Sequence, residues 1–127
     1  MEKITYKYLG DRDLKDAKIM LEHGGSPSAV GRLVQQAIEK NLKQCIENAR
    51  DTQNIYILST HNTIKLYDKV VELKGIIYDR EDRKMMSVIK DYYFDLNYPG
   101  EDTMELEYEE AKEAVTFAEY FIKKIKF

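Results

Sequence analysis

Apolar side chains recur along the chain at the three- and four-residue spacing of a helix, most clearly in its last quarter. There they alternate by four and three residues without a break, at Met104, Tyr108, Ala111, Val115, Ala118, Ile122 and Ile125. A stripe of this kind is typical of the buried seam of a bundle helix. The charged residues between these positions then face water, so the sequence predicts an amphipathic helix here.

Further segments carry the same spacing and together predict an all-α fold. The expected helices cover about residues 4–22, 28–49, 63–74 and 79–97. Gly24-Gly25-Ser26-Pro27 separates the first two, because glycine ends a helix and Ser26 or Ser28 can cap the next one. Residues 51–60 are expected to form a loop. Short connections favour antiparallel neighbours, so we expect an up-and-down antiparallel four-helix bundle with an additional short helix, in a single domain over residues 1–127.

Composition is that of a charge-rich soluble protein, with 43% hydrophobic and 34% charged residues. No apolar run reaches the about 20 residues of a membrane span, and the first residues lack the apolar core of a signal peptide. The net charge of −3 argues against a protein that mainly coats nucleic acid. Cys45 is the single cysteine and occupies an apolar helical position, which predicts a buried thiol. We therefore expect a cytoplasmic protein.

Charges are unevenly distributed along the chain. Residues 101–113 are strongly acidic, whereas Arg80, Arg83, Lys84 and Lys90 form a basic stretch. Acidic residues stabilise the start of a helix, and basic residues its end, by about 0.3–1 kcal/mol each through the helix dipole. We interpret such stretches first as structural charges, and a local basic patch is the alternative.

Residues that could perform chemistry are few. His23 is expected at the end of the first helix and His61 just before the third. The sequence contains no cysteine pair, no HExxH motif and no phosphate-binding loop. We therefore expect neither a metal site nor a bound cofactor.

The second helix sets polar side chains among apolar ones. Gln36, Lys40 and Lys43 share a face, and Glu39 lies beside them. A solvated stripe with a Glu39–Lys43 pair is one interpretation, and a ligand-binding surface is the other. Ten tyrosines are also present. Tyrosine suits a helical core, the stacking of a base or a dimer interface, and the tyrosine and methionine content predicts a homodimer.

Several segments, taken in order, resemble the HEPN family of small helical domains. They are residues 17–24 (AKIMLEHG), 36–40 (QAIEK), Thr60-His61 at the start of the third helix, 93–99 (YFDLNYP) and a last helix with several alanines from Glu110. The resemblance implies a bundle of four long helices plus a short one, commonly dimeric. Several relatives are encoded beside a minimal nucleotidyltransferase and associate with it, which implies such a partner in a toxin–antitoxin-like system.

The sequence departs from the pattern of active family members, in which an arginine precedes a histidine with four to six residues between them. Before His23, positions 16–18 hold Asp, Ala and Lys, and before His61, positions 54–56 hold Asn, Ile and Tyr. The family's Arg-Tyr-Pro ending reads Asn97-Tyr98-Pro99. We expect a non-catalytic binding module for a nucleotide, an RNA or a nucleotidyltransferase partner. The alternatives are a HEPN-type ribonuclease toxin with an atypical active site and a purely structural dimerisation module.

The expected binding surface combines lysines of the second helix with the start of the third. Lysines attract phosphate, and the free amide groups at a helix start favour an anion. The resemblance places tyrosines of the fourth helix nearby, where one of them would stack a base. The expected ligand-binding residues are Lys40, Lys43, His61, Lys65, Tyr93 and Tyr98.

Overall fold

The computed structural model describes residues 3–49, 52–95 and 105–127, with all their side chains except those of 52–55 and 93–95. Within these ranges the chain forms helices and no strand, which confirms the all-α prediction. None of the described helices combines the length and apolar character needed to cross a membrane. In chain order the elements are α1 (Tyr6–Glu22), α2 (Pro27–Asn48), the 3₁₀ helix η1 (Thr52–Ser59), α3 (Thr63–Glu72), α4 (Arg80–Asp95) and α5 (Tyr108–Ile122).

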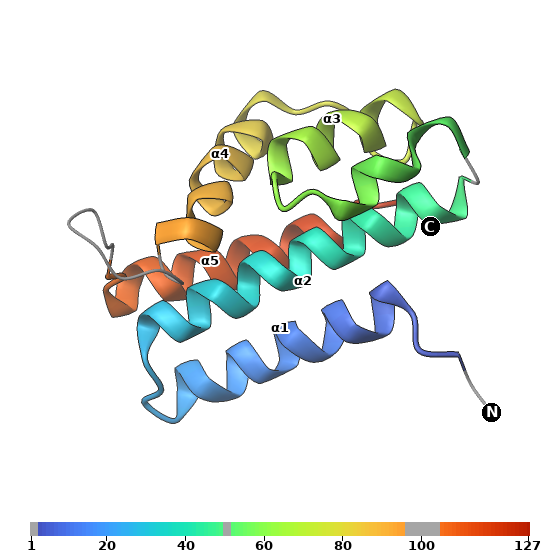
Figure 1. The fold of residues 1–127 in the computed structure, drawn as a ribbon. Coiled ribbons are helices and arrows are strands. Elements are labelled where there is room, and N and C mark those ends of the chain that lie inside the picture. Colours follow the sequence, from blue (N-terminus) through green and yellow to red (C-terminus); the bar gives the residue numbers. More distant parts are fainter. Residues whose placement is uncertain (1–2, 50–51, 96–104) are drawn as a thin grey trace.

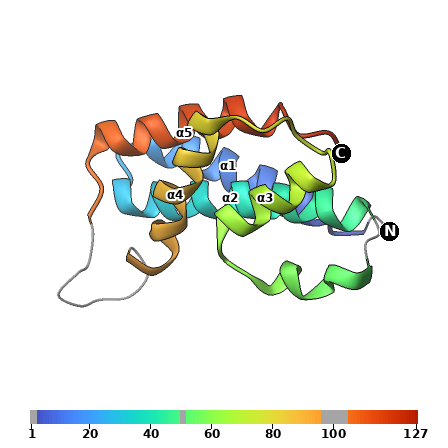
Figure 2. The same ribbon diagram turned by 90° about the horizontal axis from the view of Figure 1, so that it is seen from above.

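Helix α2 occupies the centre of the molecule, with α1 along one side, α3 and α4 on the opposite side and α5 beside it (Figure 1). Helices α1 and α2 are antiparallel, whereas α5 runs in the same direction as α2 in both views (Figures 1 and 2). The start of α1 and the end of the chain therefore lie at the same end of the molecule. There, Lys7 Nζ lies 4.3 Å from the centre of the Phe127 ring.

The turn between α1 and α2 follows from its local chemistry. Gly24 has a φ of 76°, in the left-handed region that ends α1. Ser26 caps α2 by accepting a hydrogen bond from a first-turn amide at 3.3 Å, and Pro27 is the first helical residue. This arrangement confirms the predicted end of the first helix. Of the two predicted caps, Ser26 is the residue that caps α2.

Gly10 allows α1 to approach α2 closely. A Cβ atom at this position would lie 2.8 Å from Asn41 Nδ2 and 3.0 Å from the carbonyl oxygen of Ala37. The first distance is shorter than the contacts of real Cβ atoms and the second is tighter than most, so a side chain at position 10 would require Asn41 or one of the two helices to shift. Asn41 in turn donates to the Ala37 carbonyl at 2.8 Å, which satisfies its buried amide group.

A hydrophobic core runs along α2 and includes buried side chains from α1, α3, α4 and α5. The predicted seam of α5 is confirmed, because its members from the second turn onward are buried, namely Ala111, Val115, Ala118, Ile122 and, just beyond the helix, Ile125. Tyr108 differs from the prediction. It is 51% exposed, since it is the first residue of α5 and lies at the edge of the packed region. Met104 lies outside the described residues.

Cys45 is buried, as predicted, under the last residues of the chain. Its Sγ donates to the carbonyl oxygen of Lys126 at 3.3 Å, and the Lys126 amide donates to the carbonyl oxygen of Gly75 at 2.7 Å. Burial raises the pKa of the Cys45 thiol above its ordinary value. The thiol therefore has a packing role, in which it holds the end of the chain against α2 and the connection that follows α3.

Candidate functional site

Polar residues of α2 form a buried cluster around Glu39. Gln35, Glu39 and Lys43 are spaced four residues apart and lie on one face of the helix. The side chains of Glu39 and Lys43 are each only 7% exposed, because α2 is covered on most sides by other helices. His61, from the segment before α3, completes the group. We name these four residues the Glu39 cluster.

The Glu39 carboxylate accepts a hydrogen bond from each other member of the cluster. Lys43 Nζ lies 2.8 Å and His61 Nδ1 lies 2.9 Å from Glu39 Oε1, and Gln35 Nε2 donates to Glu39 Oε2. Lys43 supplies the cation that a buried carboxylate needs. With Nδ1 as the donor, the carboxylate also sets the orientation of the His61 ring.

The path of the chain after α2 brings His61 to Glu39. Residues 51–60 were expected as a loop, but residues 52–59 form η1, after which the chain runs back along α2 (Figure 2). Asn62 then caps α3, with Oδ1 accepting hydrogen bonds from the amides of Ile64 and Lys65 at 3.0 and 3.2 Å. The cap fixes the first turn of α3, and His61, the residue before the cap, lies against α2.

The electrostatics of the Glu39 cluster limit what it can bind. The charges of Glu39 and Lys43 compensate each other, so the pair adds no net charge for a phosphate group. Gln35 Oε1 is buried and accepts no hydrogen bond within the described part of the chain. The His61 side chain is 43% exposed, so a ligand could touch an imidazole that a carboxylate orients. No group of three or more His, Cys, Asp or Glu side chains in residues 3–49, 52–95 and 105–127 could hold a metal ion.

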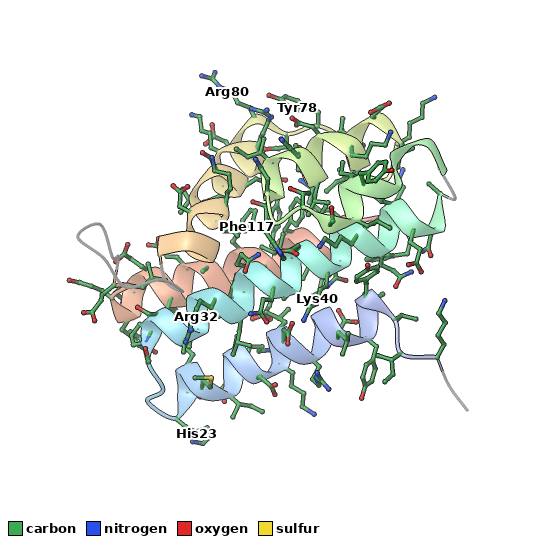
Figure 3. The ribbon with its side chains drawn as sticks, in the orientation of Figure 1. His23, Arg32, Lys40, Tyr78, Arg80 and Phe117 are labelled. Atoms are coloured by element: carbon green, nitrogen blue, oxygen red, sulfur yellow. The ribbon has the colours of Figure 1, made fainter. Side chains whose placement is uncertain are left out.

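Lys40 faces α1 and does not join the Glu39 cluster (Figure 3). Its Nζ lies 2.6 Å from Asp13 Oδ2, and the Asp13 side chain is only 9% exposed. This ion pair connects α1 and α2 close to Gly10. Each of the two predicted lysines, Lys40 and Lys43, thus lies against its own carboxylate, and they do not form one cationic surface.

The structure describes only some of the remaining predicted residues. Lys65 is exposed on α3, four residues after His61. The Asn62 cap already occupies two of the amides at the start of α3, which leaves fewer for an anion. The side chain of Tyr93 and the whole of Tyr98 lie outside the description, so the stacking of a base stays a prediction. Of the six predicted residues, the structure brings Lys43 and His61 together through Glu39, with Lys65 in the next turn.

The sequence interpretation missed Gln35 and Asp13, which are both buried. A signal was available for Gln35, because it stands four residues before Glu39 and eight before Lys43 on a helix that also carries a stripe of apolar residues. Three polar side chains in one line on such a helix indicate a hydrogen-bonded network. Asp13 carries no comparable signal, because its partner Lys40 lies on a different helix.

A protein-family model described as HEPN domain matches residues 7–127, which include the Glu39 cluster and the segments that carry the resemblance. No curated protein and no solved structure matches the chain. Because the family match covers nearly the whole length, the protein belongs to the HEPN domain family.

Proposed function

We propose that the protein is a non-catalytic binding module that acts through contacts with other protein chains. The observation that carries this proposal is an open groove of about 570 Å³ between α4 and α5. Met85, Phe117 and Tyr120 form its apolar part, and Tyr120 is 51% exposed. Methionine and aromatic side chains are enriched in interface cores. The occupant that we propose for this groove is a second copy of the chain.

A minimal nucleotidyltransferase is the further partner that we propose, in a toxin–antitoxin-like system. Its support is the HEPN resemblance alone, since several similar proteins are encoded beside such an enzyme. A nucleotidyltransferase gene adjacent to the gene for this protein would favour this partner. Co-purification of the two chains after joint expression would then test the contact directly.

A nucleotide or RNA ligand at the predicted lysines has less support. Lys40 lies 2.6 Å from Asp13, and Lys43 lies 2.8 Å from Glu39. A phosphate group would have to displace one of these carboxylates, which would then remain buried without its cation. Binding near His61 is therefore expected to be weak and sensitive to salt.

We expect the protein to sediment as a homodimer and the Tyr120→Asp substitution to shift it toward the monomer. The aspartate would place a charge in the α4–α5 groove, where burial by a second copy costs free energy. Analytical ultracentrifugation at micromolar concentrations measures the change. Tyr8→Asp is the matched control, since Tyr8 is 57% exposed but lies on α1. A monomeric wild-type protein, or equal dissociation of the two variants, would contradict the proposed interface.

A ribonuclease with an atypical active site is the second candidate, and the contact between Glu39 and His61 favours it. A carboxylate that accepts a hydrogen bond from Nδ1 holds an imidazole ready for proton transfer. An arginine is missing, however, from positions 16–18 and 54–56, where active relatives would carry it. Without that cation, the charge that develops on a phosphate during cleavage has less stabilisation.

Labelled RNA is therefore expected to stay intact when incubated with the purified protein. Cleavage that disappears in His61→Ala and persists in His23→Ala would reject the non-catalytic proposal and establish the ribonuclease. His23 is the matched control, because it is the other histidine and lies at the turn between α1 and α2 (Figure 3). Cleavage that persists in both variants would point to a contaminating nuclease.

A further inference from the structure

A hollow of about 340 Å³ lies where α3 meets the start of α4, and none of its lining residues belongs to the Glu39 cluster. Figure 3 shows Tyr78 and Arg80 close together on the outer surface, where the connection from α3 enters α4. Arg80 shares one face of α4 with the other cations of the hollow, which follow it by three and four residues. The lining residues are Ile64, Tyr78, Arg80, Arg83, Lys84 and Ser87.

The cations of this hollow outnumber the carboxylates that contact them. Arg83 binds Asp68 on α3 with two parallel hydrogen bonds of 2.9 Å. Lys84 Nζ lies 3.4 Å from Glu81 Oε1, and both side chains are exposed. Arg80 is exposed and makes no ion pair with any residue that the structure describes. The hollow thus presents one guanidinium group without a counter-charge in the described chain.

Other carboxylates at the start of α4 are engaged elsewhere. Asp79 caps the helix, because its Oδ1 accepts a hydrogen bond from the amide of Asp82 at 3.0 Å. Asp82 is buried and forms an ion pair with Lys124. Neither carboxylate makes an ion pair with Arg80 among the residues that the structure describes.

An exposed aromatic side chain stands beside these cations in a defined position. The Tyr78 ring is 55% exposed and packs against the buried Tyr67 ring, with the ring centres 6.4 Å apart. The Tyr67 hydroxyl accepts a hydrogen bond from the Asp79 amide at 2.7 Å, which fixes the backbone next to Tyr78. Tyr78 and Ile64, which both line the hollow, give it an apolar border that can contact a partner.

We propose that this hollow binds an acidic segment of another protein, in which glutamate or aspartate residues flank an apolar or aromatic side chain. The carboxylates would pair with Arg80 and Lys84 through charge-assisted hydrogen bonds. The apolar side chain would pack on Tyr78 and Ile64. This site is formed by α3 and the start of α4, so it does not depend on the α4–α5 groove or on dimerisation.

Two features favour an acidic protein segment over RNA. The aliphatic side chain of Ile64 suits the apolar residues of a peptide and offers nothing to a phosphodiester backbone. The whole chain also has a net charge of −3. That charge opposes the approach of a long polyanion more strongly than that of a short segment with few carboxylates.

Fluorescence anisotropy at low salt tests the site with a short labelled peptide of glutamates around a central phenylalanine. We expect Arg80→Glu to weaken binding about tenfold or more, the loss that corresponds to one charge-assisted hydrogen bond. Tyr78→Ala is expected to weaken it several-fold through the lost ring contact. Arg12→Glu is the matched control, because Arg12 is another exposed arginine, on α1, and the charge change is the same.

Specific loss in Arg80→Glu and Tyr78→Ala supports the proposal, provided that circular dichroism shows both variants folded. Equal weakening by Arg12→Glu would overturn it, because only overall charge would then matter. Absence of peptide binding would overturn it as well. Tighter binding of single-stranded RNA of equal length, lost in Arg80→Glu, would assign the hollow to nucleic acid instead. A monomeric protein that binds the peptide would reject the proposed dimer and leave this site supported.

Discussion

Replacement of Val115 by aspartate is expected to unfold the protein. Val115 is 4% exposed on α5 and belongs to the core along α2. On its face of the helix lie Ala111, Ala118 and Ile122, none of which can pair with a carboxylate. The expected loss is about 4–5 kcal/mol or more, out of a total stability of about 5–15 kcal/mol for a typical domain. Thermal unfolding followed by circular dichroism should show a missing or strongly lowered transition.

Two further variants show whether the buried charge itself causes the loss of stability in Val115→Asp. Val115→Ala removes two carbon atoms, should cost about 2 kcal/mol and should leave the protein folded. Ile19→Asp introduces the same carboxylate on α1, where Ile19 is 47% exposed, and should cost about 0.5–1 kcal/mol. A native-like melting curve for Val115→Asp would mean that α5 does not pack through this seam.

The positions of the helices could be predicted because their signals are local. Apolar periodicity indicated α1 to α4, and Gly24 and Pro27 mark the turn between the first two. The two wrong predictions about the helices also arose from local patterns. Apolar spacing extended the seam of α5 to Tyr108, although this residue, the first of the helix, is half exposed. Residues 52–59 form a 3₁₀ helix that is too short for its periodicity to be distinguished from a loop.

The candidate site could be predicted only in part, because burial of a polar side chain depends on which helices cover it. The four-residue spacing indicated a Glu39–Lys43 pair within a solvated stripe. The pair forms, but both of its side chains are buried rather than solvated. Its burial follows from the central place of α2, which no local pattern encodes. The partners of these residues are also distant in sequence: Asp13 is 27 residues from Lys40, and His61 is 22 residues from Glu39.

The second large effect is expected from Glu39→Ala. This substitution removes the carboxylate to which the rest of the Glu39 cluster donates. Lys43 would remain buried without a counter-charge, and Gln35 and His61 would each lose an acceptor. Breaking a buried ion pair by removal of one partner costs about 3–5 kcal/mol. Chemical denaturation followed by circular dichroism measures this loss as a lower midpoint of unfolding.

A second substitution shows whether the unpaired lysine causes the loss. Addition of Lys43→Met to Glu39→Ala replaces the buried cation with an apolar side chain, so much of the stability should return. If the loss came from the cavity left by Glu39, the double variant would be no more stable than Glu39→Ala. Arg83→Met breaks the pair with Asp68, whose side chains are 42% and 47% exposed, and should have a much smaller effect because water screens such charges. Equal losses from Glu39→Ala and Arg83→Met would show that burial is not what makes the Glu39 pair important.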